Sequence, residues 1–173
     1  MTLLSVRAAP GASRGTLAVG ERIRPCAIGR GGLVDAKREG DGGTPVGRFP
    51  LRRLFYRPDR ESAPATGLPV LPLAEDLGWC DDPAATGSYN RLVRLPFAPS
   101  HERMWRDDAL YDLVVEVGYN DAPAIPGRGS AIFLHLARPD WGPTEGCVAL
   151  QRDDLLAVLV AVGPESAIEI APL

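Results

Sequence analysis

The sequence lacks the features that mark several specialised classes of protein. No apolar run approaches the roughly 18 residues of a membrane span, since the longest covers only residues 155–162. Neither sign of charge dominates, because 19 Lys and Arg face 22 Asp and Glu, for a net charge of −3. Proteins that bind phosphate backbones usually carry a basic excess. We therefore expect no membrane span and no nucleic-acid partner.

Cysteine and histidine are scarce. Cys26, Cys80 and Cys147 are an odd number of thiols, so at least one lies outside any internal disulfide. His101 and His135 are the only histidines, and the chain has no Cys-x-x-Cys motif. Because a zinc site takes three or four protein ligands, we expect no metal and no cofactor.

Helical bundles are disfavoured by the abundance of Gly and Pro, which number 19 and 17 of 173 residues. The length fits one domain, and we expect residues 1–173 to form it. Short apolar runs separated by Gly and Pro predict strands. These runs cover residues 2–6, 15–19, 26–29, 49–56, 113–119, 131–136 and 167–170.

One helix is expected, over residues 152–162, where Gly163 and Pro164 end an apolar stripe. The stripe consists of Leu155, Leu156, Leu159 and Val160. Residues 57–99 are Pro-rich and predict a long excursion, and residues 100–111 a short helix or a turn. The predicted fold class is mainly β, with one helix packed on the sheet.

The most reactive side chains lie close together in the sequence. His135 ends a predicted strand, and Cys147 follows it by twelve residues, after a turn-rich loop. A thiolate is a strong nucleophile, and a neighbouring imidazole helps to form it. Gly146 lets the backbone approach a substrate carbonyl, and the N–H groups around Gly146 and Cys147 are candidates for stabilising an oxyanion.

Two motifs resemble the L,D-transpeptidase catalytic domain, the YkuD-type fold. That family carries a strand His, a loop, and then Ser/Thr-His-Gly-Cys; here His135 and Thr144-Glu-Gly-Cys-Val-Ala-Leu150 occupy those places. Upstream, Gly43-Thr-Pro-Val-Gly-Arg-Phe49 matches the family's Gly-rich Thr-Pro-x-Gly. The resemblance implies a β-sandwich or barrel with a helix near its C-terminal end, a Cys147 nucleophile and a His135 base.

The chain departs from the family pattern at four places. Glu145 replaces a His, Ala149 an Arg and Leu136 a Gly, and the loop before Thr144 is short. These positions shape the pocket, so the departures imply a substrate or cross-linking site that differs from the commonest members. A proteobacterial subgroup with this variant pattern is associated with cross-links between L-Ala and diaminopimelate.

Several other residues are candidates for binding substrate. Thr144 and Glu145 adjoin the nucleophile, and Glu145 is placed to orient a substrate amine or His135. Lys37, near Asp41, either lines the site or is a solvated loop charge. Trp141 either walls the groove or caps the core.

Tyr89 and Asn90 are candidates for anchoring the excursion over the cleft, with a purely structural role as the alternative. Asp81 and Asp82 are interpreted as a turn rather than a carboxylate pair. His101 lies in a polar stretch and is expected to be exposed, whereas Cys26 is expected in the core.

The resemblance implies a peptidoglycan L,D-transpeptidase that joins diaminopimelate-type stem peptides through a Cys147 thioacyl intermediate, making 3,3 or 1,3 cross-links. The alternatives are a carboxypeptidase, endopeptidase or amidase on the same route, and a non-catalytic wall-binding module. The family implies the periplasm, although no signal peptide is visible in the first 15 residues. The sequence does not indicate an oligomeric state.

Overall fold

The computed structural model describes residues 1–173, and β-strands dominate it. Fourteen strands and one helix follow one another along the chain. In order they are β1 (Leu3–Ala8), β2 (Arg14–Val19), β3 (Arg22–Ala27), β4 (Leu33–Val34), β5 (Thr44–Pro45), β6 (Gly47–Tyr56), β7 (Val70–Pro72), β8 (Leu77–Cys80), β9 (Leu92–Arg94), β10 (His101–Arg103), β11 (Leu113–Val117), β12 (Phe133–Leu136), β13 (Val148–Leu150), α1 (Arg152–Ala161) and β14 (Ala167–Pro172).

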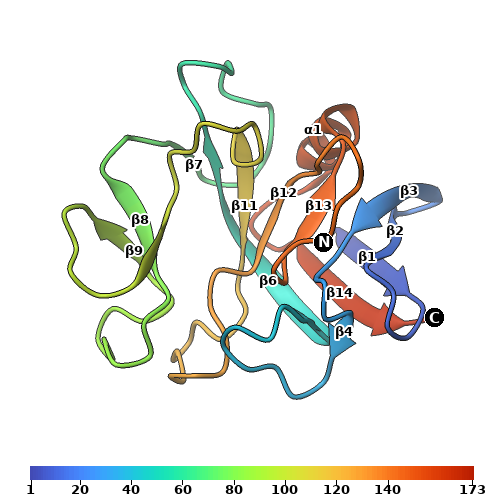
Figure 1. Cartoon of the computed structure of the whole chain (residues 1–173). Helices are drawn as coiled ribbons and strands as arrows, with labels where there is room; N and C mark the ends of the chain where they lie inside the picture. The colour runs from blue at the N-terminus through green and yellow to red at the C-terminus, as the bar shows by residue number, and fades with distance from the viewer.

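The main sheet closes on itself. Its nine strands have the order β11-β12-β13-β3-β2-β1-β14-β6-β7, and β6 also pairs with β11, so the first eight strands form a barrel (Figure 1). Closure leaves no long row of unpaired N–H and C=O groups along an edge of the sheet. The mainly β barrel with one helix that the sequence predicts is thereby confirmed.

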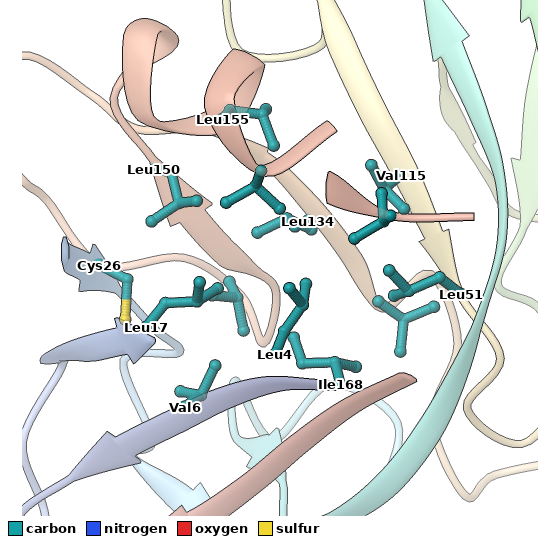
Figure 2. Packing of buried hydrophobic residues seen from close by; sticks show 14 of the residues in the cluster. Leu4, Val6, Leu17, Cys26, Leu51, Val115, Leu134, Leu150, Leu155 and Ile168 are labelled. Atoms are coloured by element: carbon teal, nitrogen blue, oxygen red, sulfur yellow. The ribbon is translucent and has the colours of Figure 1, made fainter. Parts of the chain in front are cut away.

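A cluster of 23 buried hydrophobic residues fills the barrel (Figure 2). Alternation along the strands selects its members. In β1, Leu4, Val6 and Ala8 are buried while Ser5 and Arg7 lie outward. In β12, Leu134 and Leu136 join this cluster while Phe133 and His135 face the other way, as the sequence predicts. The two faces of β12 therefore separate the core from the site.

The helix α1 packs on the barrel through Leu155, Val158 and Leu159, which all belong to the barrel cluster. The predicted stripe is wrong at Val160, which is 71% exposed, because the barrel contacts the face that begins at Leu155 and therefore buries Val158 and Leu159 at i+3 and i+4. No helix of the chain is long and apolar enough to cross a membrane.

A second, smaller sheet lies beside the barrel, in the order β10-β8-β9 (Figure 1). Its β8 and β9, together with β7, lie within residues 57–99, where no strands were expected from the sequence. The helix considered for residues 100–111 is wrong, since β10 and turns occupy that segment. A cluster of nine hydrophobic residues joins the two sheets: Phe55, Leu73, Leu77, Trp79, Met104, Tyr111, Val114, Phe133 and Cys147.

Substitution of the two valines near the end of α1 tests which face of the helix packs on the barrel. Val158 is 1% exposed and Val160 is 71% exposed. Val158→Ala should lower the free energy of unfolding by about 2 kcal/mol, since it removes two buried methyl groups and leaves a cavity. Val160→Ala, the matched control, should change it by less than about 0.5 kcal/mol. Urea denaturation measures both, and equal effects would contradict the packing.

Candidate active site

Parallel pairing of β12 and β13 brings Cys147 and His135 to one pocket. In the register of the two strands, Leu134 lies opposite Val148 and His135 opposite Ala149. Cys147 directly precedes β13, so its side chain lies on the same face as that of His135, which is two residues further along the neighbouring strand. Both side chains line a pocket of about 470 Å³.

The Cys147 thiol is nearly buried, at 6% exposure, and has two backbone partners. Its S–H donates to the Ala131 carbonyl at 3.2 Å, and Sγ accepts a hydrogen bond from the Phe133 N–H at 3.3 Å. Burial raises the pKa of Cys147 to about 12, and the Glu102 carboxylate adds to this effect. Cys147 is therefore a neutral thiol whose proton is held by the Ala131 carbonyl.

Backbone contact fixes the tautomer of His135. Its Nδ1 lies 2.9 Å from the Leu136 carbonyl oxygen. A carbonyl only accepts, so Nδ1 carries the hydrogen and Nε2 keeps its lone pair. Burial lowers the pKa of His135 to about 4, which keeps the ring neutral near pH 7. His135 is thus available as a base through Nε2.

The loop before Cys147 is held by two threonines. Thr144 Oγ1 donates to the Cys147 carbonyl at 2.6 Å and accepts from the Gly146 N–H at 3.1 Å. Thr44, which is fully buried, donates to the Gly146 carbonyl at 2.9 Å and accepts from the Gly29 N–H at 2.8 Å. The Thr-Pro motif that the sequence singles out therefore holds the loop before Cys147 in place.

Glycine is required at position 146. Its φ is +135°, and a Cβ there would lie 2.7 Å from the Gly43 carbonyl oxygen. The Gly146 N–H is already bound to Thr144, whereas the Cys147 N–H has no hydrogen-bond acceptor within the protein. Of the two N–H groups predicted to face an oxyanion, that of Cys147 is the free one.

The rim of the pocket carries several predicted binding residues. Lys37 is buried at the pocket wall, with Nζ 2.7 Å from Asp41 Oδ1, and Glu145 is exposed and pairs with Arg30 at 2.9 Å. Glu145 therefore lies by the nucleophile but is oriented by Arg30. Arg138, just after β12, also lines the pocket and is exposed without an ion-pair partner.

Three of the predicted substrate-binding residues lie outside the pocket lining. Tyr89 is fully buried, and its hydroxyl donates to Glu39, a lining residue. Asn90 accepts from Trp79 Nε1 and the Ala131 N–H, both at 3.0 Å, which ties β8 to the residue that holds the thiol proton. Trp141 is half-buried in the loop that follows β12 and is not among the lining residues.

Sequence reasoning missed the pair of Glu102 and Tyr111. The Tyr111 hydroxyl donates to Glu102, and its ring centroid lies 5.2 Å from that of His135. Burial raises the pKa of Glu102 to about 6. Neither residue belongs to a motif; only the polar Ser-His-Glu-Arg stretch gave a signal, and it was interpreted as an exposed surface.

Four further residues singled out in the sequence, two of which line the pocket, can now be placed in the structure. His101 is half-buried in β10 and lines the pocket, so the expectation that it is exposed is wrong. Asp82 caps a turn through the Ala84 N–H at 2.9 Å, as expected, whereas Asp81 lines the pocket. Cys26 is in the barrel core, also as expected.

A family model of the L,D-transpeptidase catalytic domain, YkuD, matches residues 13–170. The chain belongs to this family. Membership supports a peptidoglycan-related function of the cysteine-dependent L,D-transpeptidase type. A search of curated proteins gave no match.

Solved structures of similar fold include L,D-transpeptidase 1 of Mycobacterium tuberculosis, with 15% identity and a TM-score of 0.40. Another is the helical cell shape determining protein Pgp2 of Campylobacter jejuni, with 16% identity and a TM-score of 0.48. The matches cover 98% and 99% of this chain but only 62% and 48% of the two proteins. This YkuD-family chain therefore spans less than two thirds of either.

The neutral resting state of Cys147 predicts a specific pH profile for its alkylation. Because the pKa of the thiol is raised to about 12, iodoacetamide should react slowly at pH 7, and its rate should rise about tenfold per pH unit up to at least pH 10. Peptide mapping separates Cys147 from Cys26 and Cys80. A rate that already levels off below pH 7 would indicate a thiolate–imidazolium pair and contradict the assignment.

Proposed function

We propose that this chain is a peptidoglycan L,D-transpeptidase that joins stem peptides through a thioacyl intermediate on Cys147. The observation that supports this best is the placement of a thiol and an imidazole on neighbouring parallel strands, on one face and in one pocket. The His135 tautomer, with Nε2 free, supplies the base that this chemistry needs.

In the first step, Cys147 Sγ attacks the carbonyl carbon of an L-configured residue in a donor stem. The thiol proton passes to His135 Nε2 as the S–C bond forms, because a neutral thiol is a poor nucleophile. The carbonyl oxygen becomes an oxyanion and accepts a hydrogen bond from the free Cys147 N–H. His135 then protonates the leaving amine as the C–N bond breaks, which leaves a thioester.

In the second step, an amine of another stem attacks the thioester. His135 takes a proton from the attacking nitrogen, the C–S bond breaks, and sulfur recovers a proton. The product is a 3,3 or a 1,3 cross-link between diaminopimelate-type stems. The thiol proton must first leave the Ala131 carbonyl, so substrate binding has to turn the S–H toward His135.

The unpaired Arg138 gives one rim of the pocket a positive charge, and Thr144 keeps the nucleophile loop in shape. Carboxylates of the stem peptide suit the unpaired Arg138 guanidinium. The periplasm, where stem peptides are found, is the proposed location.

Product analysis tests this function. The protein should convert purified diaminopimelate-type muropeptides into dimers, and mass spectrometry with fragmentation should locate the new bond. Cys147→Ala should abolish turnover, and His135→Ala should lower the rate by roughly 10²–10⁴-fold, the usual contribution of a general base. Circular dichroism checks that both variants fold.

Shortened monomers without dimers would make the protein a hydrolase of the same route. Full activity of either variant would contradict the mechanism, and no product together with no adduct on Cys147 would favour a wall-binding role.

A further inference from the structure

One wall of the pocket carries three carboxylates that form no ion pair with a cation of the protein. Glu39, Asp81 and Glu102 all line it, and each is half-buried. None of the three forms an ion pair, although each accepts a hydrogen bond from a hydroxyl group. The donors are Tyr89 to Glu39, Ser100 to Asp81 and Tyr111 to Glu102.

Two cations of the same pocket, Lys37 and Arg106, form their ion pairs with carboxylates outside this wall. Lys37 binds Asp41, and Arg106 binds Asp108 while stacking 5.0 Å from the centroid of the Tyr111 ring. A hydroxyl orients a carboxylate but does not cancel its charge. The wall, defined as Glu39, Asp81 and Glu102, therefore presents negative charge to whatever enters.

A second observation is independent of the acidic cluster. Ser130 lines the same pocket, is 8% exposed, and its Oγ is the one buried side-chain oxygen or nitrogen in the protein without a hydrogen-bond partner. An unpaired buried hydroxyl is destabilising, so it is rare in a folded protein. It precedes Ala131, whose carbonyl binds the Cys147 thiol. An unpaired hydroxyl thus lies in the pocket lining, one residue from the carbonyl that binds the Cys147 thiol.

Metal binding does not account for these residues, because no group of three or more His, Cys, Asp or Glu side chains is placed to hold a metal ion. The carboxylates are spread along the wall instead. A primary ammonium fits this arrangement, because it donates three hydrogen bonds and accepts none.

We propose that the wall and Ser130 Oγ bind the ammonium group of the acceptor amine, with Glu102 as the residue that holds it beside the Cys147 thioester. This inference rests on the proposed transpeptidase function and assigns the acceptor side of the same site. Tyr111 links Glu102 to Cys147: its hydroxyl donates to Glu102, and its ring belongs to the hydrophobic cluster that contains Cys147.

The chemistry balances with this placement. The bound ammonium loses one proton to bulk water and becomes a neutral amine. Its lone pair forms the N–C bond, and the C–S bond then breaks. The second proton passes from nitrogen through His135 Nε2 to sulfur, which restores the neutral thiol. Glu102 remains a positioning group and forms no covalent bond.

The test measures how the thioester partitions between two fates. With diaminopimelate-type muropeptides, attack by amine gives dimers and attack by water gives shortened monomers. Glu102→Gln keeps the shape and the Tyr111 contact but loses the charge, and should lower the ratio of dimers to shortened monomers about tenfold or more. Ser130→Ala should lower it about threefold while the melting temperature holds or rises, since it removes an unpaired hydroxyl.

Two controls separate this inference from the proposed function. Glu165→Gln makes the same charge change at an exposed turn after α1 and should leave the ratio unchanged. Hydroxylamine, which is largely uncharged at neutral pH, should trap the Glu102→Gln thioester as efficiently as the wild-type thioester. The mass of the Cys147 adduct shows that acylation itself is intact.

An unchanged ratio in both Glu102→Gln and Ser130→Ala, with the adduct present, would overturn the inference and leave the transpeptidase proposal standing. Slower adduct formation with an unchanged ratio would mean that the wall binds an ammonium group of the donor stem rather than of the acceptor, and would also overturn the inference. If the wild-type protein forms no adduct at all, both proposals fail.

Discussion

The site depends on the parallel pairing of β12 with β13. Side chains alternate between the two faces of a strand, and in this register His135 lies opposite Ala149, two residues after Cys147. Cys147 and His135 therefore face one pocket, although an eleven-residue loop separates β12 from β13. The same alternation sends Leu134, Val148 and Leu150 into the barrel core. Burial of these side chains thus fixes the register, and a slip of one residue would bury the imidazole in the core and turn the leucines outward.

The loop between the two strands returns to β13 under tight constraints. Thr44 reaches from β5 to the Gly146 carbonyl, and a side chain at Gly146 would collide with the Gly43 backbone. Asn90, from the segment between β8 and β9, holds Ala131, which in turn holds the thiol proton. The small sheet is therefore coupled to Cys147, and both Glu102 of β10 and Asp81, which directly follows β8, lie in the pocket wall.

Local patterns in the sequence were sufficient for most of the barrel strands, for the helix, and for placing His135 and Cys147 in one region. They were insufficient where contacts between residues distant in the sequence determine the structure. β13 is only three residues long and gave no separate signal, and β7 to β10 are short strands whose pairing comes from distant partners. The role of Glu102 could not be read from its neighbours, because nothing in Ser-His-Glu-Arg shows that the Tyr111 hydroxyl binds its carboxylate. Val160 was placed on the wrong side of α1 because neighbouring positions in an all-apolar run are indistinguishable without the surface they face.

The most direct test is to detect the acyl-enzyme itself. The protein is mixed with tetrapeptide muropeptide, quenched in acid within the first turnover, and analysed by intact mass and peptide mapping. The account predicts one added stem-peptide acyl group, located on Cys147 and removed by hydroxylamine. Product formation with Cys147 unmodified, or an acyl group on Cys26 or Cys80 instead, would contradict it.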